Sequence, residues 1–222
     1  MSDTSRGWTI FTKIKTLFYK LFFEWIIILK NNKKEIRFLE IGPGDERIRD
    51  FETINIIKTK NTDYVSDVSK KIDFPDKTFN IVYASHILEH IPWYMLEKTI
   101  KEWTRVLKIG GSLEVWVPDG LKIAKAFCDS EQGINNDFMK DGWYRFNEEK
   151  DPTKWFSGRM FSYGDGIGTR GHFNFHLATF SERYLKKLFI DAGFKNIVKM
   201  DNSECRGYDH GWINLGIKGT KK

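Results

Sequence analysis

The hydrophobic pattern of the chain changes near residue 36. Beyond it, short apolar runs alternate with a segment of helical periodicity. The apolar runs that predict buried strands are residues 36–41, 54–57, 64–65, 79–84 and 112–118. Before the last of these, apolar residues at helical spacing predict a helix over 95–107: Leu96, Ile100, Trp103 and Leu107. Strands that alternate with helices are typical of a parallel sheet with helices on both faces.

The C-terminal residues complete this sheet. Ser181 is a suitable N-cap for a helix over 181–192, and Gly193 ends that helix. Residues 197–200 and 212–217 then predict a closing antiparallel pair of strands. The pattern therefore predicts an α/β fold with a doubly wound, mostly parallel, seven-stranded sheet and an antiparallel final strand.

The first 34 residues contain an amphipathic segment. Apolar residues between Trp8 and Leu29 recur at helical spacing, but three lysines and Glu24 interrupt them, so the segment does not predict a membrane span. No small-residue cleavage site follows, which argues against a signal peptide. Our preferred interpretation is a helix that covers one side of the sheet. A basic helix at a membrane surface or in a dimer is the alternative, so peripheral membrane contact and the oligomeric state stay open.

Residues 119–178 are rich in glycine and aromatic residues and show little periodicity. We expect an insertion after the fifth strand that carries functional side chains rather than forming a core element. The chain is thus a single domain. Its parts are the N-terminal helix (1–34), a cofactor-binding half (35–119), a substrate-side insertion (120–180) and the closing helix and strands (181–222).

Composition narrows the function. The chain has 222 residues, 41% of them hydrophobic and 30% charged, which is enough for one core. Its net charge of +6 comes from scattered lysines, which usually make a soluble surface, and alternatively suits an anionic small molecule. No compact basic block interleaved with aromatic residues suggests nucleic acid. Cys128 and Cys205 have no spacing typical of a disulfide framework or a zinc site, so we predict no metal site and a cytoplasmic location.

The string FLEIGPGD at 38–45 places a glycine turn directly after the first strand. Gly42 and Gly44 let the backbone approach a ligand closely at the carboxyl edge of the sheet, and Pro43 stiffens the loop. A dinucleotide-binding loop would have a third glycine where this chain has Arg47. Glu40 adds a carboxylate that suits the cationic amino-acid portion of a cofactor better than a phosphate.

Further strings follow in order: SDV at 66–68, IDFPDKTF at 72–79, ASHILEHI at 84–91 and KEWTRVLKIGGSLEVWVPD at 101–119. Together with the glycine loop they resemble the signature of class I S-adenosylmethionine-dependent methyltransferases. Ile109 stands where that family usually has proline. The resemblance covers residues 36–119 and implies a Rossmann-like fold and S-adenosylmethionine as the cofactor.

The resemblance also implies roles for matching positions. Glu40, Gly42 and Gly44, with Pro43 between the glycines, would hold the methionine moiety and ribose. Asp67 would bind the adenine amine with Val68 beside the ring, and Ser85 and His86 would line the methionine end. The family usually ends its second strand in an acid that binds the ribose hydroxyls. Here the candidate is Asn55, which offers one amide oxygen, or Ile57, which offers none.

If the acceptor is a hydroxyl, a histidine within hydrogen-bond reach would assist catalysis. His86, His172 and His176 are the candidate bases. Glu89 and His90, one turn beyond His86, suit a structural role as well as a functional one. In the insertion, we expect Arg159, Tyr163, Arg170 and His172 to bind substrate, with the two arginines clamping a phosphate.

The predicted function is methyl transfer to an oxygen of a small phosphorylated or nucleotide-linked capsule precursor, either a sugar or a phosphoramidate. This acceptor rests on the resemblance, which includes members that modify bacterial surface polysaccharides. One alternative is a lipid or other small-molecule methyltransferase at a membrane surface. Another is a non-catalytic binding module that keeps the fold without transferring methyl groups.

Overall fold

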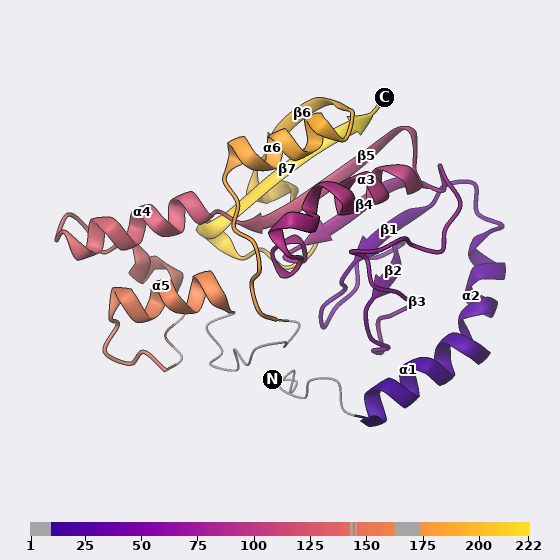
Figure 1. Cartoon of the computed structure of the whole chain (residues 1–222), viewed down its shortest axis with the longest axis horizontal. Coiled ribbons are helices and arrows are strands. Elements are labelled where there is room, and N and C mark those ends of the chain that lie inside the picture. The colour runs from indigo at the N-terminus through magenta and orange to yellow at the C-terminus, as the bar shows by residue number, and fades with distance from the viewer. Residues whose placement is uncertain (1–9, 143, 145, 163–173) are drawn as a thin grey trace.

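A computed structural model of the chain describes residues 10–142, 144, 146–162 and 174–222. Its centre is a seven-stranded sheet in the order β3-β2-β1-β4-β5-β7-β6 (Figure 1). The strands are β1 (Phe38–Ile41), β2 (Glu52–Asn55), β3 (Tyr64–Val65), β4 (Phe79–Ser85), β5 (Leu107–Pro118), β6 (Phe194–Met200) and β7 (Asn214–Lys221). β7 runs opposite in direction to the other six strands. The predicted fold is confirmed.

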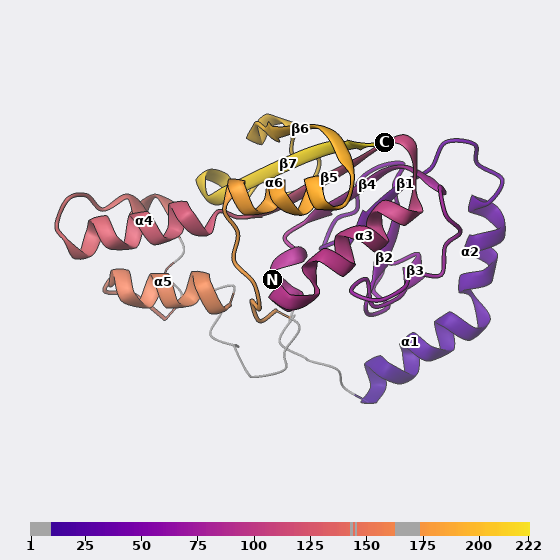
Figure 2. The ribbon, with the colours of Figure 1, turned by 45° about the horizontal axis from the view of Figure 1, so that its top comes forward.

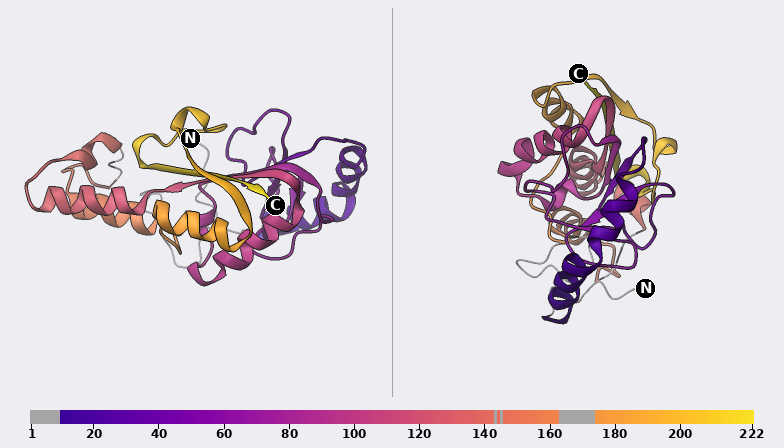
Figure 3. Two further views of the ribbon diagram at one scale, coloured as in Figure 1. Left: turned by 90° about the horizontal axis from the view of Figure 1, so that it is seen from above. Right: turned by 90° about the vertical axis from the view of Figure 1, so that its right-hand side faces the viewer.

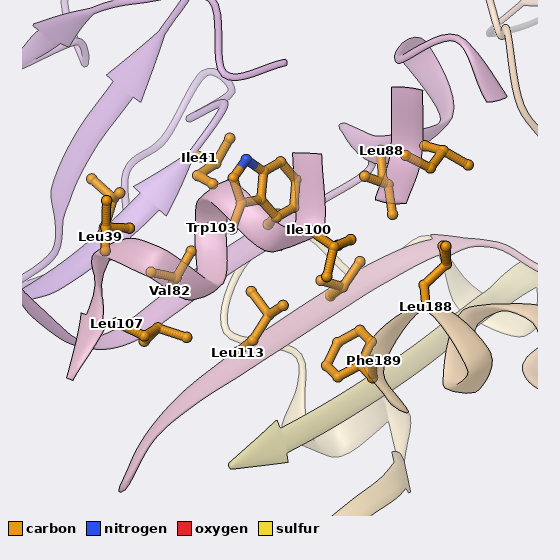
Figure 4. Close-up of a cluster of buried hydrophobic side chains, with 14 of the residues drawn as sticks. Leu39, Ile41, Val82, Leu88, Ile100, Trp103, Leu107, Leu113, Leu188 and Phe189 are labelled. Atoms are coloured by element: carbon orange, nitrogen blue, oxygen red, sulfur yellow. The ribbon is translucent and has the colours of Figure 1, made fainter. Parts of the chain in front are cut away.

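Two helices cover one face of the sheet, α3 (Leu96–Val106) and α6 (Glu182–Asp191) (Figure 2). They bury Trp103, Leu188 and Phe189 against strand residues such as Leu39, Val82 and Leu113 (Figure 4). Burying each such side chain contributes roughly 1.5–3 kcal/mol, so this face is the main core. The opposite face carries a smaller cluster of Phe51, Tyr83, Trp116 and Met200. Residues 42–51, all of them described, join β1 to β2 without a helix.

The N-terminal segment forms two helices, α1 (Ile10–Phe22) and α2 (Glu24–Asn31), beside edge strand β3 (Figure 1). Polar side chains make the contact: Tyr19 Oη donates to the Asp63 carbonyl at 2.9 Å, Lys20 Nζ donates to the Val65 carbonyl at 3.0 Å, and Glu24 Oε1 accepts from the Val65 N–H at 2.7 Å. An edge strand exposes unpaired backbone groups, and these side chains satisfy them.

The apolar face of α1 and α2 therefore points to solvent. Ten large apolar side chains between residues 11 and 29 are exposed, among them Phe11 at 76% and Leu21 at 61%. Our preferred interpretation, a helix covering one side of the sheet, is wrong on this point, because the edge of the sheet attracts the polar face of the helices. No helix among the described residues is long and apolar enough to span a membrane.

The insertion is more regular than its sequence predicts. It contains α4 (Gly120–Glu131), the 3-10 helix η3 (Asp137–Asp141) and α5 (Pro152–Phe161). Figure 3 shows these helices projecting from one end of the sheet, opposite α1 and α2. They share a small core in which Phe127 stacks on Phe156 at 4.5 Å and Trp155 stacks on Trp212 at 6.2 Å. The expectation of an insertion without core elements is wrong, because apolar residues from segments distant in the sequence pack together into this small core.

Both ends of the insertion meet at the carboxyl end of β5. The Asp119 carboxylate accepts from the N–H groups of Leu121 and Lys122 and so caps α4. The Gly120 N–H donates to the Phe180 carbonyl at 2.8 Å. A Cβ on Gly120 would collide with the side chain of Thr179, so glycine permits this close approach. The segment thus leaves the sheet and returns to it at adjacent backbone positions.

Candidate active site

The glycine loop lies where β1 ends. The Gly42 N–H donates to the Ile54 carbonyl at 2.8 Å, and Gly42 has a φ of +70°. A Cβ at this position would also collide with the Ile87 side chain, so position 42 requires glycine. A Cβ on Gly44 would meet no atom within 4 Å. The space beside Gly44 is therefore open to a ligand, as cofactor binding at this loop requires.

Glu40 binds the backbone of the segment that follows the glycine loop. Its side chain is buried, and Oε2 accepts from the Ile48 N–H at 2.9 Å. Burial raises the pKa of Glu40 despite that bond and the nearby Arg47 guanidinium. Arg47 itself donates to the Asp63 carboxylate at 2.6 Å. Arg47, at the position where a dinucleotide-binding loop has glycine, thus links this loop to the segment before β3.

Asp67 lies two residues beyond β3 and is one-third exposed. Oδ1 accepts from the Ser69 N–H at 3.1 Å and from the Ser69 hydroxyl at 2.6 Å, and Oδ2 lies 3.0 Å from Lys70 Nζ. Burial opposes ionisation, but these bonds outweigh it and lower the pKa of Asp67. The carboxylate is therefore held in the charged form that accepts hydrogen bonds from an amine. Val68 follows it and packs against the main core.

Asn55 is the last residue of β2, so the carboxylate usual at this strand end is absent here. Its side-chain oxygen accepts from the N–H of Ile56 at 2.7 Å. This local bond competes with the predicted ribose contact. Ser85 ends β4 at the same edge of the sheet, next to Trp116 of β5.

His86 follows β4 and is buried, with a φ of +53° that costs a residue with a side chain about 1–3 kcal/mol. Nε2 lies 2.9 Å from Asn214 Oδ1, whose amide donates to Asp209 Oδ1 at 2.6 Å. Because that amide orientation makes Asn214 Oδ1 an acceptor, His86 Nε2 is the donor. Nδ1 lies 3.1 Å from Glu89 Oε1. Both ring nitrogens of this candidate base are therefore engaged by protein groups.

Glu89 is the centre of the site. Its side chain is 1% exposed, and its backbone carbonyl accepts from the N–H groups of Leu177 and Ala178 at 2.7 and 3.1 Å. Burial alone would raise the pKa of Glu89, but the adjacent His86 imidazole outweighs burial and lowers it to about 2. The site therefore holds a buried carboxylate.

Two further histidines surround this carboxylate. His90 Nδ1 lies 3.3 Å from the Phe175 carbonyl oxygen, and His176 Nδ1 lies 3.1 Å from the Arg159 carbonyl oxygen. Their ring centroids are 5.0 Å apart. Burial lowers the pKa of His176 to about 4, so this imidazole is neutral at pH 7. His210 stacks on His86 at 3.8 Å, and burial lowers its pKa to about 3.

A cavity opens beside this group. Its lining includes Glu89, Pro118, Gly120, Arg159, His176 and Thr179. Arg159 Nε donates to Asp141 Oδ2 at 2.5 Å, and Trp155 Nε1 donates to the same oxygen at 2.7 Å. The cavity lies at the carboxyl ends of the strands, where α/β sheets bind ligands. A cationic and an imidazole side chain thus reach it from the insertion side.

The structure brings together four of the five histidines, His86, His90, His176 and His210. Tyr163, Arg170 and His172, three predicted substrate or catalytic residues, lie outside the described residues. Sequence reasoning missed His210, Asn214 and Asp141. Two of them lie in the string DHGWIN at 209–214. Because they are more than 120 residues away from His86 in the sequence, no local pattern could reveal their contact with it.

The sheet order and the glycine turn after β1 define the class of fold, a Rossmann-like α/β domain with a ligand site at its carboxyl edge. Residues 49–115 match a family described as a methyltransferase domain. The matched range contains Asp67 and Val68, the predicted adenine-binding residues, and His86, Glu89 and His90 of the histidine group. Over these residues the chain is similar to methyltransferase domains, in agreement with the predicted class and with S-adenosylmethionine as its cofactor.

Known proteins resemble the chain in part. It is 34% identical over 76 residues to sterol 4-C-methyltransferase strm-1 of Caenorhabditis elegans, an alignment that covers 34% of this chain and 22% of that protein. The structure of a possible histamine N-methyltransferase from Thermotoga maritima has a TM-score of 0.48 at 19% identity and 96% coverage of both chains. The PH0226 protein of Pyrococcus horikoshii gives a TM-score of 0.49 at 16% identity, with 98% of this chain and 93% of that chain covered.

Proposed function

We propose that the protein transfers the methyl group of S-adenosylmethionine to an oxygen of a small, anionic acceptor. A phosphorylated or nucleotide-linked capsule precursor, sugar or phosphoramidate, is the acceptor class we favour. The observation that carries the proposal is the cavity at the carboxyl end of β5, lined by Arg159, His176 and Glu89. Of these groups, Arg159, which also pairs with Asp141, is the one that would favour a phosphorylated hydroxyl compound over an apolar one.

Bound S-adenosylmethionine supplies a methyl group on a sulfonium centre. The chain's own residues then position the reactants, because in-line displacement depends mainly on alignment and exclusion of water. Gly42 and Gly44 allow the backbone close to the cofactor, and Asp67 accepts a hydrogen bond from its adenine amine. We assign the acceptor side to His176. His86 acts as a positioning residue for Glu89, since both of its nitrogens are engaged.

Asp67→Ala is expected to weaken S-adenosylmethionine binding by roughly tenfold to a hundredfold, because a buried amine loses an acceptor worth about 1–3 kcal/mol. Isothermal titration calorimetry measures this change. Asp73→Ala is the matched control, since the Asp73 side chain is 85% exposed. Wild-type affinity in Asp67→Ala would mean that the adenine binds elsewhere. No binding by the wild-type chain at millimolar cofactor would favour a non-catalytic module.

A methylation assay with labelled S-adenosylmethionine tests the acceptor. We expect transfer to nucleotide-linked or phosphorylated sugars or to phosphoramidates. Turnover of sterols or other lipids alone would contradict this acceptor class and favour the second candidate function.

That second candidate is methyl transfer at a membrane surface. The exposed apolar face of α1 and α2 favours it, because ten large apolar side chains lie among six lysines between residues 11 and 34 that are also exposed. Basic amphipathic helices of this kind bind anionic lipid surfaces.

For this candidate, Leu21→Glu is expected to reduce binding to phosphatidylserine-containing vesicles by roughly tenfold, since an exposed leucine no longer enters the lipid interface. Vesicle sedimentation measures the effect. Ile190→Glu on α6 is a matched control, because Ile190 is 62% exposed and Leu21 is 61% exposed. Self-association in sedimentation velocity, with no vesicle binding, would assign this face to a dimer instead.

A further inference from the structure

Three side chains of the site, Glu89, His90 and His176, present one ligand atom each within 4.8 Å of one another. We infer that they form a binding site for one divalent transition-metal ion. Binding of the ion itself is independent of the proposed function, whereas its role in methyl transfer rests on that function. The sequence predicts no metal site, because the cysteines lack ligand spacing and His90 and His176 lie 86 residues apart.

The orientation of both histidines suits metal binding. Their Nδ1 atoms face the carbonyl oxygens of Phe175 and Arg159, which only accept hydrogen bonds. Nδ1 therefore carries a proton, and Nε2 is the atom that can coordinate. Metal-binding histidines are commonly fixed in this way, with one nitrogen donating to a carbonyl group and the other binding the ion.

Glu89 supplies the third ligand. It is 1% exposed, and neither carboxylate oxygen has a hydrogen-bond partner of good geometry among the described residues. His86 Nδ1 lies 3.1 Å from Oε1, while Oε2 has no comparable partner in that part of the chain. A buried carboxylate oxygen without a partner is costly, and coordination to a cation would satisfy it.

The donor set defines the chemical class of the ion. Two imidazole nitrogens and one carboxylate oxygen suit Zn²⁺, Fe²⁺, Mn²⁺ or Co²⁺ and do not suit Ca²⁺, which takes oxygen ligands. Ligands at about 2.1 Å from one ion lie roughly 3.4 Å apart in a tetrahedral site, so the three atoms, now within 4.8 Å of one another, need to approach by at most about 1.4 Å. Three protein ligands leave a coordination position for another molecule.

That position would serve the acceptor, because Glu89 and His176 both line the cavity. A hydroxyl bound to a divalent ion loses its proton more readily, as metal-bound water does. The acceptor O–H bond breaks and its proton passes to water. The oxygen lone pair then forms the bond to the methyl carbon while the carbon–sulfur bond breaks, and S-adenosylhomocysteine leaves as a neutral thioether. His176 would then hold the ion rather than accept the proton.

Equilibrium dialysis of chelator-treated protein against Zn²⁺ tests the site. We expect one equivalent to bind, and Co²⁺ in its place to give a change in visible absorption. Glu89→Gln and His176→Gln should each weaken Zn²⁺ binding by at least about a hundredfold, since each removes one of three ligands. His210→Gln is the control, because His210 stacks on His86 but belongs to no ligand set. Thermal melts establish that each variant is folded.

No Zn²⁺ uptake by the wild-type chain would overturn the inference. Uptake that persists unchanged in both ligand variants would overturn it too, and a Cys128→Ser/Cys205→Ser variant would show whether thiols hold the ion instead. Calorimetry with S-adenosylmethionine on metal-free protein separates the two proposals. Loss of cofactor binding with intact Zn²⁺ uptake would contradict the proposed function and leave the metal site standing.

Discussion

Gly44→Val is expected to reduce S-adenosylmethionine binding by at least about a hundredfold, a loss of about 2.7 kcal/mol, while the protein stays folded. A Cβ at this position meets no protein atom within 4 Å, so an added side chain begins in open space. It would occupy the space through which the cofactor approaches the loop backbone.

Calorimetric titration and a thermal melt of the same sample measure both parts of this result. Gly42→Val is the informative comparison, because its φ of +70° and the adjacent Ile87 side chain make that substitution destabilising as well. Unchanged affinity in folded Gly44→Val would show that the cofactor binds away from the glycine loop.

Glu52→Ala should lower the free energy of unfolding by about 3–5 kcal/mol. Arg37 donates to both Glu52 oxygens at 2.8 Å, and the two side chains are 7% and 2% exposed. Tyr64 Oη donates to Glu52 Oε2 at 2.6 Å and accepts from Asn31 Nδ2 at 2.7 Å. Removal of Glu52 leaves a buried guanidinium without its counter-ion, which costs far more than loss of an exposed pair.

Urea unfolding measures this loss. The double variant Arg37→Met/Glu52→Leu should recover most of the stability, because apolar residues of similar volume avoid the uncompensated charge. Asp191→Ala, at the exposed Lys187–Asp191 pair, should change stability little. A Glu52→Ala variant as stable as the wild type would mean that the network contributes nothing to folding.

The sequence predicts those parts of the fold that depend on local pattern. Leu96, Ile100 and Trp103 at helical spacing gave the helix that the structure shows as α3, and most strand ends fall within three residues of their expected positions. The start of β5 is wrong, because this strand begins at Leu107 rather than at residue 112. Among the first four strands, β2 differs most from its predicted range, because it begins and ends two residues earlier. Its first residues, Glu52 and Thr53, are buried polar residues that an apolar pattern misses. The glycine loop is recognisable because its chemistry lies in eight consecutive residues.

Contacts between distant residues could not be predicted in this way. The helices of the insertion depend on Trp155 packing against Trp212, and the orientation of α1 depends on backbone groups of β3. In the histidine group, Glu89 contacts the end of the insertion, and His86 contacts Asn214 at the start of β7 and His210 just before it. Each of these requires the folded sheet, which brings the segments to one edge.

The attachment of the insertion has an evolutionary consequence. Because Gly120 and Phe180 are bonded at the carboxyl end of β5, the chain between them can be lengthened, shortened or exchanged without altering a strand of the sheet. Residues 120–180 thus leave and rejoin the sheet at one place, so exchange of this segment would leave the strands continuous. Descendants of one ancestral chain could acquire new acceptors by recombination within this segment alone.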